Sequence, residues 1–137
     1  MRDADDLSDL ETLTLTIWGE ARSESILGRG AVAMVIKNRV DARTWYGNGF
    51  KKVCLKGWQF SAWNSNDPNR ALMLNVSASD RKFIECGAIA ELCMADALRD
   101  VTNGATHYHT AAVTPSWSKH KSPSRIIGRH QFYNNID

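Results

Sequence analysis

Apolar residues recur at helical spacing over three long segments, 6–21, 25–41 and 79–99, and this feature most constrains the fold. Each segment is long enough for a helix of several turns with one buried face. In the first, Ser8 and Glu11 stand at the spacing of a capping box. The pattern therefore predicts a mainly helical domain in which these three helices build the core.

The second and third helices carry further local signals. Gly28 and Gly30 each weaken a helix interior by up to ~1 kcal/mol relative to alanine, which predicts the close approach of another backbone or, as the alternative, a kinked start of the helix. The apolar run GRGAVAMVIKNRV around them predicts a central helix. We expect the dipeptide Asn103-Gly104 to stop the third helix.

Residues 42–77 break the helical pattern, because glycine and asparagine punctuate them heavily. Six aromatic residues crowd into the same stretch, and we expect Trp58 to pack into the core. A long irregular segment in a compact domain is usually functional. The sequence predicts a loop region that short helical turns interrupt.

Two segments near the C-terminus favour strands. ATHYHTA, residues 105–111, alternates in polarity, and GRHQFYN, residues 128–134, suits a second short strand. We find no repeat or linker, and 137 residues suit one domain. The expected fold class is α+β, mostly helical with a small antiparallel β element, in a single catalytic domain over residues 1–137.

Composition excludes several kinds of function. A net charge of +2 is too small to indicate a nucleic-acid binder. No apolar run approaches the length of a membrane span, so we expect no stable membrane insertion. The first ten residues, MRDADDLSDL, lack the basic start and apolar centre of a secretory signal. We therefore expect the protein to stay in the cytoplasm in which it is made unless something else releases it.

The three cysteines are expected to be free thiols. Cys86 and Cys93 are seven residues apart on one predicted helix. That spacing separates their Cα atoms by about 10 Å, beyond the reach of a disulfide. No CxxC motif is present, and no cysteine is paired with a histidine at zinc-ligand spacing.

Glu20 is the first candidate for chemistry. It falls in the last turn of the first predicted helix, where the dipole and apolar neighbours would raise the pKa of a carboxyl group. A carboxyl that stays protonated near neutral pH can act as a general acid. The alternative is a solvated glutamate or an ion pair with Arg22. Glu24 could pair with Glu20 in an unbroken helix, but a break at Ser23 favours a place in the first turn of the second helix.

The histidines offer a rival chemistry. His107 and His109 would share one face of a strand, and His130 could lie opposite them. Two histidines so spaced can bind zinc, as a zinc-dependent amidase or peptidase requires. The alternative is a polar cleft wall, which the absence of an HExxH motif favours.

The segment WQFSAWN suits a sugar site. In an extended conformation Gln59, Ser61 and Trp63 would share a face. Amides bind hydroxyl and acetamido groups, and an indole can stack on a pyranose ring. The alternative is a turn whose tryptophan fills the core.

Six segments together resemble the SleB/CwlJ-type cell-wall hydrolase family of spore cortex-lytic enzymes and phage endolysins. In chain order they are IWGEARSES, GRGAVAMVIKNRV, WQFSAW, ATHYHT, TPSW and IIGRHQFY, and they span residues 17–133. Each is weak alone, and their order makes the resemblance specific. Ser23 stands where the family often has glycine, and the loop 64–77 does not align.

The resemblance implies a lysozyme-like fold and an enzyme that cleaves the glycan strand of peptidoglycan. It implies a lytic transglycosylase that needs no cofactor or metal and forms 1,6-anhydromuramic ends. The catalytic glutamate of the family, the first of the GEAR motif, falls on Glu20. Around it we expect Gln59, Ser61 and Tyr108 to bind near the acetamido group. We expect Trp63, His109 and Trp117 to line the glycan groove, and His130 to hold the two strands together.

Three alternatives stay open: a hydrolytic lysozyme, a zinc-dependent amidase and a non-catalytic glycan-binding module. The expected biology is that of a phage-type endolysin, made in the host cytoplasm without a signal peptide. It would act on the periplasmic wall after release. The expected partner is the peptidoglycan glycan strand, and the expected oligomeric state is a monomer.

Overall fold

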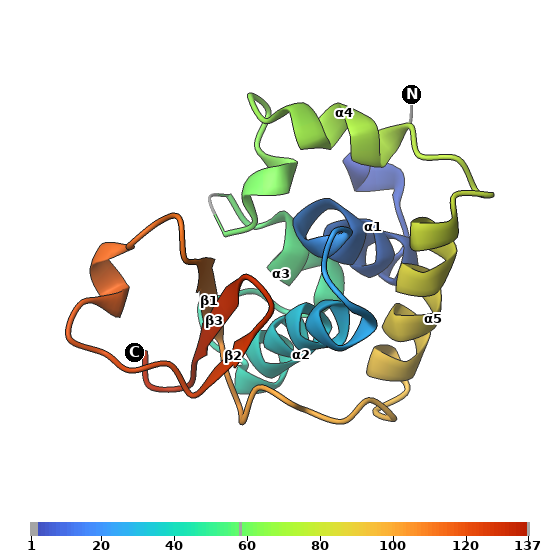
Figure 1. The fold of residues 1–137 in the computed structure, drawn as a ribbon. Helices are drawn as coiled ribbons and strands as arrows, with labels where there is room; N and C mark the ends of the chain where they lie inside the picture. Colours follow the sequence, from blue (N-terminus) through green and yellow to red (C-terminus); the bar gives the residue numbers. More distant parts are fainter. Residues whose placement is uncertain (1–2, 58, 137) are drawn as a thin grey trace.

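A computed structural model describes residues 3–57 and 59–136, so Trp58 lies outside the described residues. The α-helices are α1 (Asp9–Ala21), α2 (Ile26–Ala42), α3 (Phe50–Leu55), α4 (Pro68–Leu74) and α5 (Arg81–Met94). Short 3-10 turns are η1 (Ala4–Asp6), η2 (Ser61–Trp63) and η3 (Ser116–Ser118). The strands are β1 (His107–Thr110), β2 (Arg125–Ile127) and β3 (His130–Tyr133). Figure 1 shows the helices gathered on one side of the molecule and the sheet on the other.

Helix α1 packs against α2, α3, α4 and α5. Its start confirms the predicted capping box: the Ser8 hydroxyl accepts from the Glu11 N–H, and the Glu11 carboxylate accepts from the Ser8 N–H, both at 3.1 Å. The predicted start at residue 6 is wrong, because Ser8 has an extended backbone and the helix begins at Asp9. Leu13 and Ile17 are fully buried. The end of α1, where Glu20 lies, is therefore held by packing on several sides.

Helix α2 packs against α1, α3 and α5 and contacts β2, and it starts after Ser25, whose hydroxyl caps the Gly28 N–H at 3.1 Å. A side chain at Gly28 would meet the Glu24 Cβ at 3.0 Å, and one at Gly30 would find Leu98 at 4.0 Å. The predicted approach of another backbone is wrong, because both neighbours are side chains.

Helix α5 ends at Met94, so the predicted stop at Asn103-Gly104 is wrong. Asp96 adopts a left-handed φ of 60° and closes a Schellman motif. In that motif the Ala97 N–H donates to the Leu92 carbonyl at 2.8 Å, and the Asp96 N–H donates to the Cys93 carbonyl at 3.1 Å. The chain then crosses to the sheet.

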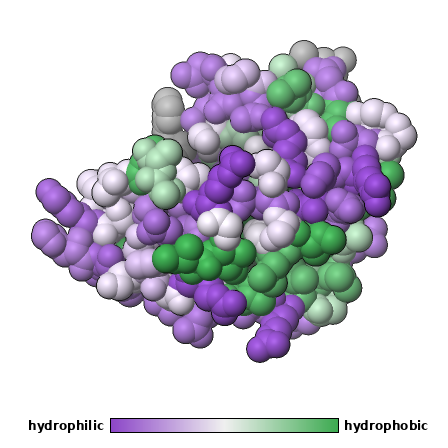
Figure 2. Space-filling view, in the orientation of Figure 1, coloured by the Kyte–Doolittle hydropathy of each residue, from purple (hydrophilic) through white to green (hydrophobic). Residues whose placement is uncertain are grey.

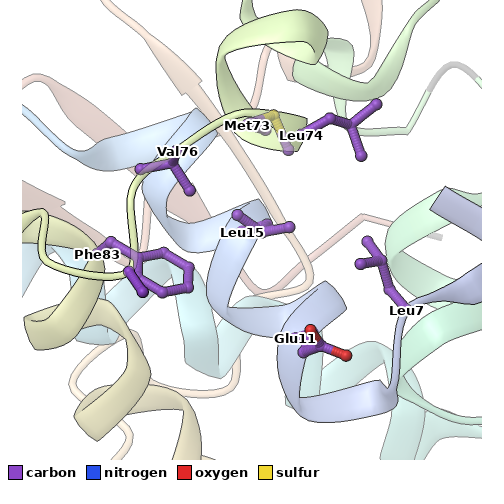
Figure 3. A pocket seen from close by; sticks show the side chains of 8 residues that line it. Leu7, Glu11, Leu15, Met73, Leu74, Val76 and Phe83 are labelled. Atoms are coloured by element: carbon purple, nitrogen blue, oxygen red, sulfur yellow. The ribbon is translucent and has the colours of Figure 1, made fainter. Parts of the chain in front are cut away.

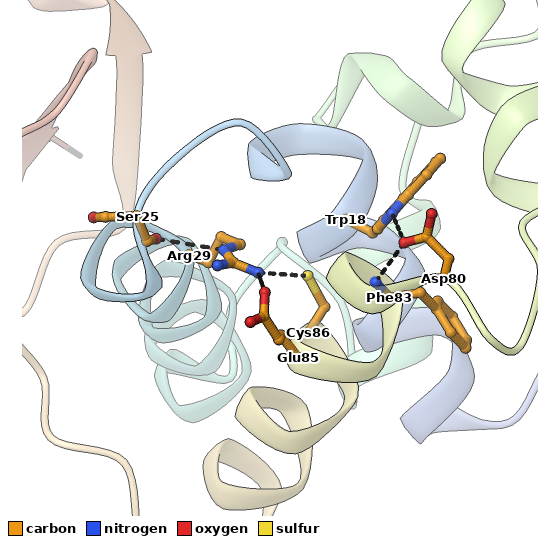
Figure 4. Close-up of polar contacts among 7 residues, drawn as sticks. All are labelled: Trp18, Ser25, Arg29, Asp80, Phe83, Glu85 and Cys86. Carbon is orange, nitrogen blue, oxygen red and sulfur yellow. Dashed lines mark hydrogen bonds and ion pairs between the residues drawn. The ribbon is translucent and has the colours of Figure 1, made fainter.

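Polar contacts tie α1 and α2 to α5 (Figure 4). The buried Arg29 guanidinium forms an ion pair with Glu85 at 3.0 Å. The Trp18 indole donates to the Asp80 carboxylate at 3.2 Å, and that carboxylate also caps the Phe83 N–H at 2.8 Å. These contacts fix the C-terminal end of α1 relative to α5.

The three strands form an antiparallel sheet in the order β1-β3-β2. The two predicted strands are confirmed at 107–110 and 130–133, and β2 is an addition. Tyr108 lies opposite Phe132, and Thr110 lies opposite His130. The α+β class, mostly helical with a small antiparallel element, is confirmed.

Cys54, Cys86 and Cys93 are buried free thiols, as expected.

A mainly apolar cavity of about 240 Å³ lies between α1, α4 and the start of α5 (Figure 3). Figure 2 shows a mostly hydrophilic face with hydrophobic residues gathered in its lower part. None of the helices in the described residues is long and apolar enough to cross a membrane.

Candidate active site

A second cavity, of about 450 Å³, contains Glu20. Its lining comes from both halves of the molecule: the helices α1, α2 and α4, the segment 59–61, the strands β1 and β3, and the loop after β1. The lining residues are Gly19, Glu20, Arg39, Gln59, Ser61, Asn69, Tyr108, His109, Thr110, Val113, Pro115, Trp117 and His130. This volume lies in the usual range for ligand sites. The apolar cavity of Figure 3 has no comparable set of converging polar groups.

Glu20 is partly buried, and each of its oxygens accepts one hydrogen bond. The Tyr108 hydroxyl donates to Oε1 at 2.5 Å, and the Ala62 N–H donates to Oε2 at 3.1 Å. Burial raises the pKa of the Glu20 carboxyl above its usual value, and the charge of Asp67 acts in the same direction. The two hydrogen bonds and the Arg39 charge oppose the rise but do not cancel it.

Arg22 turns away from the Glu20 carboxyl group. Its Nη1 donates to the Trp18 and Gly19 carbonyls at 3.3 Å, and its guanidinium stacks 4.4 Å from the centre of the Trp18 ring. The alternative of a Glu20–Arg22 ion pair is therefore wrong. Burial is the largest cause of the raised pKa of Glu20, and Arg22 is not among the charges that shift it most.

Arg39 is a site residue that the sequence did not reveal. It is 5% exposed, in the last turn of α2, and its Nε donates to the Thr106 carbonyl at 2.7 Å. The guanidinium also lies 5.0 Å from the ring centre of Tyr46 and 5.1 Å from that of Phe60. Burial lowers the pKa of Arg39, and no carboxylate of the described residues forms an ion pair with it. An arginine inside the apolar run GRGAVAMVIKNRV was the available signal.

The three residues of WQFSAWN that were predicted to share a face do not all lie in the cavity. Gln59 and Ser61 line the cavity, but Trp63 does not. The predicted extended conformation is wrong, because Ser61–Trp63 is a 3-10 turn. Trp63 is 5% exposed and its indole donates to the Thr16 hydroxyl at 2.8 Å. Such a buried indole has no open face for a sugar ring, so the placement contradicts its predicted role in the groove.

Tyr108, which was predicted near the acetamido group, lines the cavity, and so do the predicted groove residues His109 and Trp117. His109 Nδ1 lies 2.7 Å from the Thr110 carbonyl, so this nitrogen must carry a proton. In the neutral ring Nε2 then accepts from the Tyr133 hydroxyl at 2.8 Å. Trp117 packs edge-on against Tyr133 at 5.2 Å and is partly exposed in the cavity wall.

The remaining histidines are packed among aromatic rings. His107 lies 4.9 Å from Trp117, and burial, with the Arg39 charge, lowers its pKa to about 4. His130 lies 4.8 Å from Tyr108, and its Nδ1 is buried without a hydrogen-bond partner among the described residues. In residues 3–57 and 59–136, no group of three or more His, Cys, Asp or Glu side chains could hold a metal ion.

Glu24 does not pair with Glu20. It lies just before the Ser25 cap, outside α2, so the predicted place in the first helical turn is wrong. Its side chain is buried, and Oε1 accepts from the Arg129 N–H at 3.0 Å in the turn between β2 and β3. Glu24 therefore supports the hairpin, and Glu20 is the one carboxylic acid that lines the cavity within residues 3–57 and 59–136.

This site can move one proton at a time. A carboxyl group with a raised pKa lies among a phenol, two amides and an indole, groups that can bind a neutral, hydroxyl-rich ligand. Such a site is suited to general acid and base chemistry on a bound ligand.

Comparison with known proteins identifies the family of the chain. The chain belongs to the Cell Wall Hydrolase family, which matches residues 23–133. Glu20 lies just before the matched range. A spore cortex-lytic enzyme of Halalkalibacterium halodurans is 28% identical over 130 residues, which are 93% of this chain and 35% of that enzyme. The chain thus spans about a third of this relative.

The fold is that of a solved catalytic domain. The catalytic domain of the germination-specific lytic transglycosylase SleB from Bacillus anthracis superposes with a TM-score of 0.72. The match covers 94% of this chain and 98% of that one, at 23% identity. This similarity confirms the lysozyme-like fold.

Proposed function

We propose that this domain cleaves the glycan strand of peptidoglycan between N-acetylmuramic acid and N-acetylglucosamine, as a lytic transglycosylase. One observation carries the proposal: among the described residues, Glu20, with a raised pKa, is the one carboxylic acid lining the cavity. The family and the names of the two relatives support the same substrate.

In the proposed reaction, protonated Glu20 donates its proton to the glycosidic oxygen as the bond to the muramic C1 breaks. The 2-acetamido oxygen of the muramic sugar stabilises the developing positive charge. Glu20, now a carboxylate, removes the proton of the muramic C6 hydroxyl, and that oxygen closes the 1,6-anhydro ring on C1. One carboxylate suffices because the substrate itself provides the nucleophiles.

The surroundings of Glu20 suit both halves of this cycle. Burial favours the acid that begins the reaction. The Tyr108 hydroxyl and the Ala62 N–H stabilise the carboxylate that forms, and the Arg39 charge acts in the same sense. Two opposed influences keep the carboxyl able to give a proton and to take one back.

The hydrolytic lysozyme is the main alternative. Retaining and inverting hydrolysis ordinarily need two carboxyl groups flanking the bond. The charge of Asp67 influences Glu20, but its carboxylate caps α4 by accepting from the Asn69 N–H at 2.9 Å, and Asp67 does not line the cavity. The arrangement therefore favours the transglycosylase.

The deciding experiment compares the wild type with Glu20→Gln on purified peptidoglycan sacculi, with products read by mass spectrometry. We expect anhydro-muramic ends from the wild type and none from Glu20→Gln. Products heavier by one water at those ends would identify a lysozyme. Release of stem peptides that stops in EDTA would identify a zinc amidase. Binding of sacculi without any products would identify a non-catalytic module.

The endolysin role stays a prediction, and so does the monomeric state. We propose to express the chain in the cytoplasm of a Gram-negative host with and without a separate pore-forming protein. Lysis that needs both the pore and Glu20 would support a phage-type endolysin released to the periplasmic wall. Light scattering on the purified chain measures its oligomeric state.

A further inference from the structure

Two carboxamide side chains line the cavity from different segments, and each one binds an arginine. Gln59 Oε1 accepts from Arg39 Nη1 at 3.1 Å. Asn69, in the first turn of α4, accepts through Oδ1 from Arg22 Nη2 at 2.7 Å. Asn69 belongs to the segment 64–77, which does not align with the family in the sequence.

The arginines determine which way both amides are turned. A guanidinium group only donates hydrogen bonds, so the atom that faces it must be the amide oxygen. Each NH₂ group is then left over, and no side-chain partner within the described residues binds it. Since His130 Nδ1 is the one buried unpartnered side-chain N or O atom in that part of the chain, the two amide nitrogens of Gln59 and Asn69 are not buried. Both residues line the cavity, where these nitrogens can meet a ligand.

Both arginines are themselves held in place. Arg22 is anchored by two carbonyls at the end of α1 and by the Trp18 ring. Arg39 is anchored by the Thr106 carbonyl and by two aromatic rings. Donors that are oriented before binding lose little entropy when they meet an acceptor, which increases both affinity and selectivity.

We propose that Gln59 and Asn69 form a pair of fixed N–H donors that bind acetamido carbonyl oxygens of the glycan and select N-acetylated over de-N-acetylated strands. The inference rests on the proposed function, because it names the glycan as the ligand of this cavity. A carbonyl oxygen accepts from an NH₂ group, whereas the ammonium of a de-N-acetylated sugar offers only donors. A site that hydrogen-bonds a substrate group discriminates strongly against an analogue without it, because its own polar groups are then left unpaired.

Binding in the Glu20→Gln background tests the proposal without turnover. The ligands are N-acetylglucosamine oligomers and oligomers of equal length with free amino groups, and the measurement is titration calorimetry. We expect Glu20→Gln to prefer the acetylated oligomer by about tenfold, the upper end of what one neutral hydrogen bond contributes. Adding Asn69→Asp or Gln59→Glu replaces the NH₂ donor by a carboxylate that can pair with the arginine. Each should lower the preference by about tenfold and move it towards the amino oligomer.

The matched control is Asn66→Asp, an equal charge change at an exposed turn residue just before α4 and outside the cavity. It should keep the preference of the Glu20→Gln parent. Arg22→Met offers a second variant that retains the amide but frees it to rotate, and we expect part of the preference to be lost. Thermal unfolding of each variant confirms that it is folded.

Two outcomes overturn the inference: no preference in the Glu20→Gln parent, or equal preferences in Asn69→Asp, Gln59→Glu and Asn66→Asp. Failure of the proposed function looks different, because the wild type would then release no anhydro products from sacculi. Anhydro products together with unchanged preferences would remove only the acetamido assignment.

Discussion

The Tyr108 hydroxyl donates a 2.5 Å hydrogen bond to Oε1 of Glu20 and so joins β1 to the end of α1. The bond stabilises the carboxylate, whereas burial of the same group stabilises the acid. Burial is the larger influence, so the pKa of Glu20 is raised. The Tyr108 hydrogen bond therefore limits the rise in the pKa of Glu20.

Replacing Tyr108 by phenylalanine should make the Glu20 carboxyl group harder to ionise. Loss of a hydrogen bond to the ionised form raises the pKa of Glu20 further. The alkaline limb of the pH profile of kcat/KM should therefore move to higher pH. We expect kcat to fall by roughly 10- to 100-fold, which corresponds to the loss of a hydrogen bond to a charged group. The measurement is the rate of sacculus digestion across pH.

Tyr133→Phe is the matched control for this substitution. Tyr133 lies in the neighbouring strand β3, and its hydroxyl bonds His109 instead of Glu20. The alkaline limb should stay where it is in the wild type. An alkaline limb that moves equally in both variants would show that a general loosening of the sheet, and not the bond to Glu20, is responsible.

Glu20→Gln should stabilise the fold while it abolishes activity. The folded-state pKa of Glu20 lies above its unfolded value, so the native state binds more protons between the two values. The stability of the wild type therefore falls as pH rises through that window, and glutamine cannot ionise. We expect the Tm advantage of Glu20→Gln to be small below the ordinary pKa of a glutamate and larger near neutrality. An advantage that did not change with pH would contradict the raised pKa.

The sequence predicted the helices because the features that form a helix, its cap and its apolar spacing, lie within a few residues of one another. The Ser8 cap and the apolar spacing of α1, α2 and α5 are examples. The end of α5 could not be placed, because an aspartate, Asp96, adopts the left-handed conformation that glycine usually supplies. Strand β2 has three residues, too few for a periodic signal.

The site was only partly visible in the sequence, because its contacts join distant segments. Glu20 stood out at a helix end, but its partners Tyr108 and Ala62 are 88 and 42 residues away. Arg39 and Asn69 enter the cavity only through the packing of α2 and α4 around α1. Trp63 was assigned to the groove from an extended conformation that the chain does not adopt.

His107 should make the fold sensitive to acid. Burial and the Arg39 charge lower its pKa from 6.5 to about 4. Between these values the unfolded state binds more protons, so stability decreases as pH falls through the window. His107→Phe, which keeps an aromatic ring beside Trp117, should flatten the dependence of Tm on pH there. His120→Gln, at an exposed histidine, should keep it. Equal slopes in both variants would assign the acid sensitivity to other groups.

Gly19 allows α4 to pack against α1. A Cβ at this position would overlap the sulfur of Met73, which is 1% exposed. Alanine improves helix propensity by up to ~1 kcal/mol, but overpacking typically costs about 1–3 kcal/mol. We therefore expect Gly19→Ala to lower the free energy of unfolding in urea. Gly87→Ala in α5 is the control, because its Cβ would meet only Thr14, at 3.8 Å, and should stabilise.

The clash with Met73 can be separated from other effects by a double-mutant cycle. Met73→Ala alone opens a cavity and should cost about 2–5 kcal/mol. In that background Gly19→Ala should cost less than in the wild type, with a coupling energy of about 0.5–3 kcal/mol. Additive costs would mean that the sulfur is not what opposes the alanine.

Glu24 should stabilise the turn between β2 and β3 by accepting a hydrogen bond and not by its charge. Its Oε1 accepts from the Arg129 N–H at 3.0 Å, while the Arg129 guanidinium is exposed and 4.0 Å from the other oxygen. Exposed ion pairs contribute little, whereas a buried amide without a partner costs about 1–3 kcal/mol. Glu24→Gln, which keeps an acceptor, should thus remain close to the wild type in stability. Glu24→Ala should lose about that amount, and amide hydrogen exchange in β3 should quicken because this turn leads into His130.

Arg129→Ala keeps the backbone N–H and should match Glu24→Gln. If Glu24→Gln instead lost as much as Glu24→Ala, the charge would be the stabilising feature.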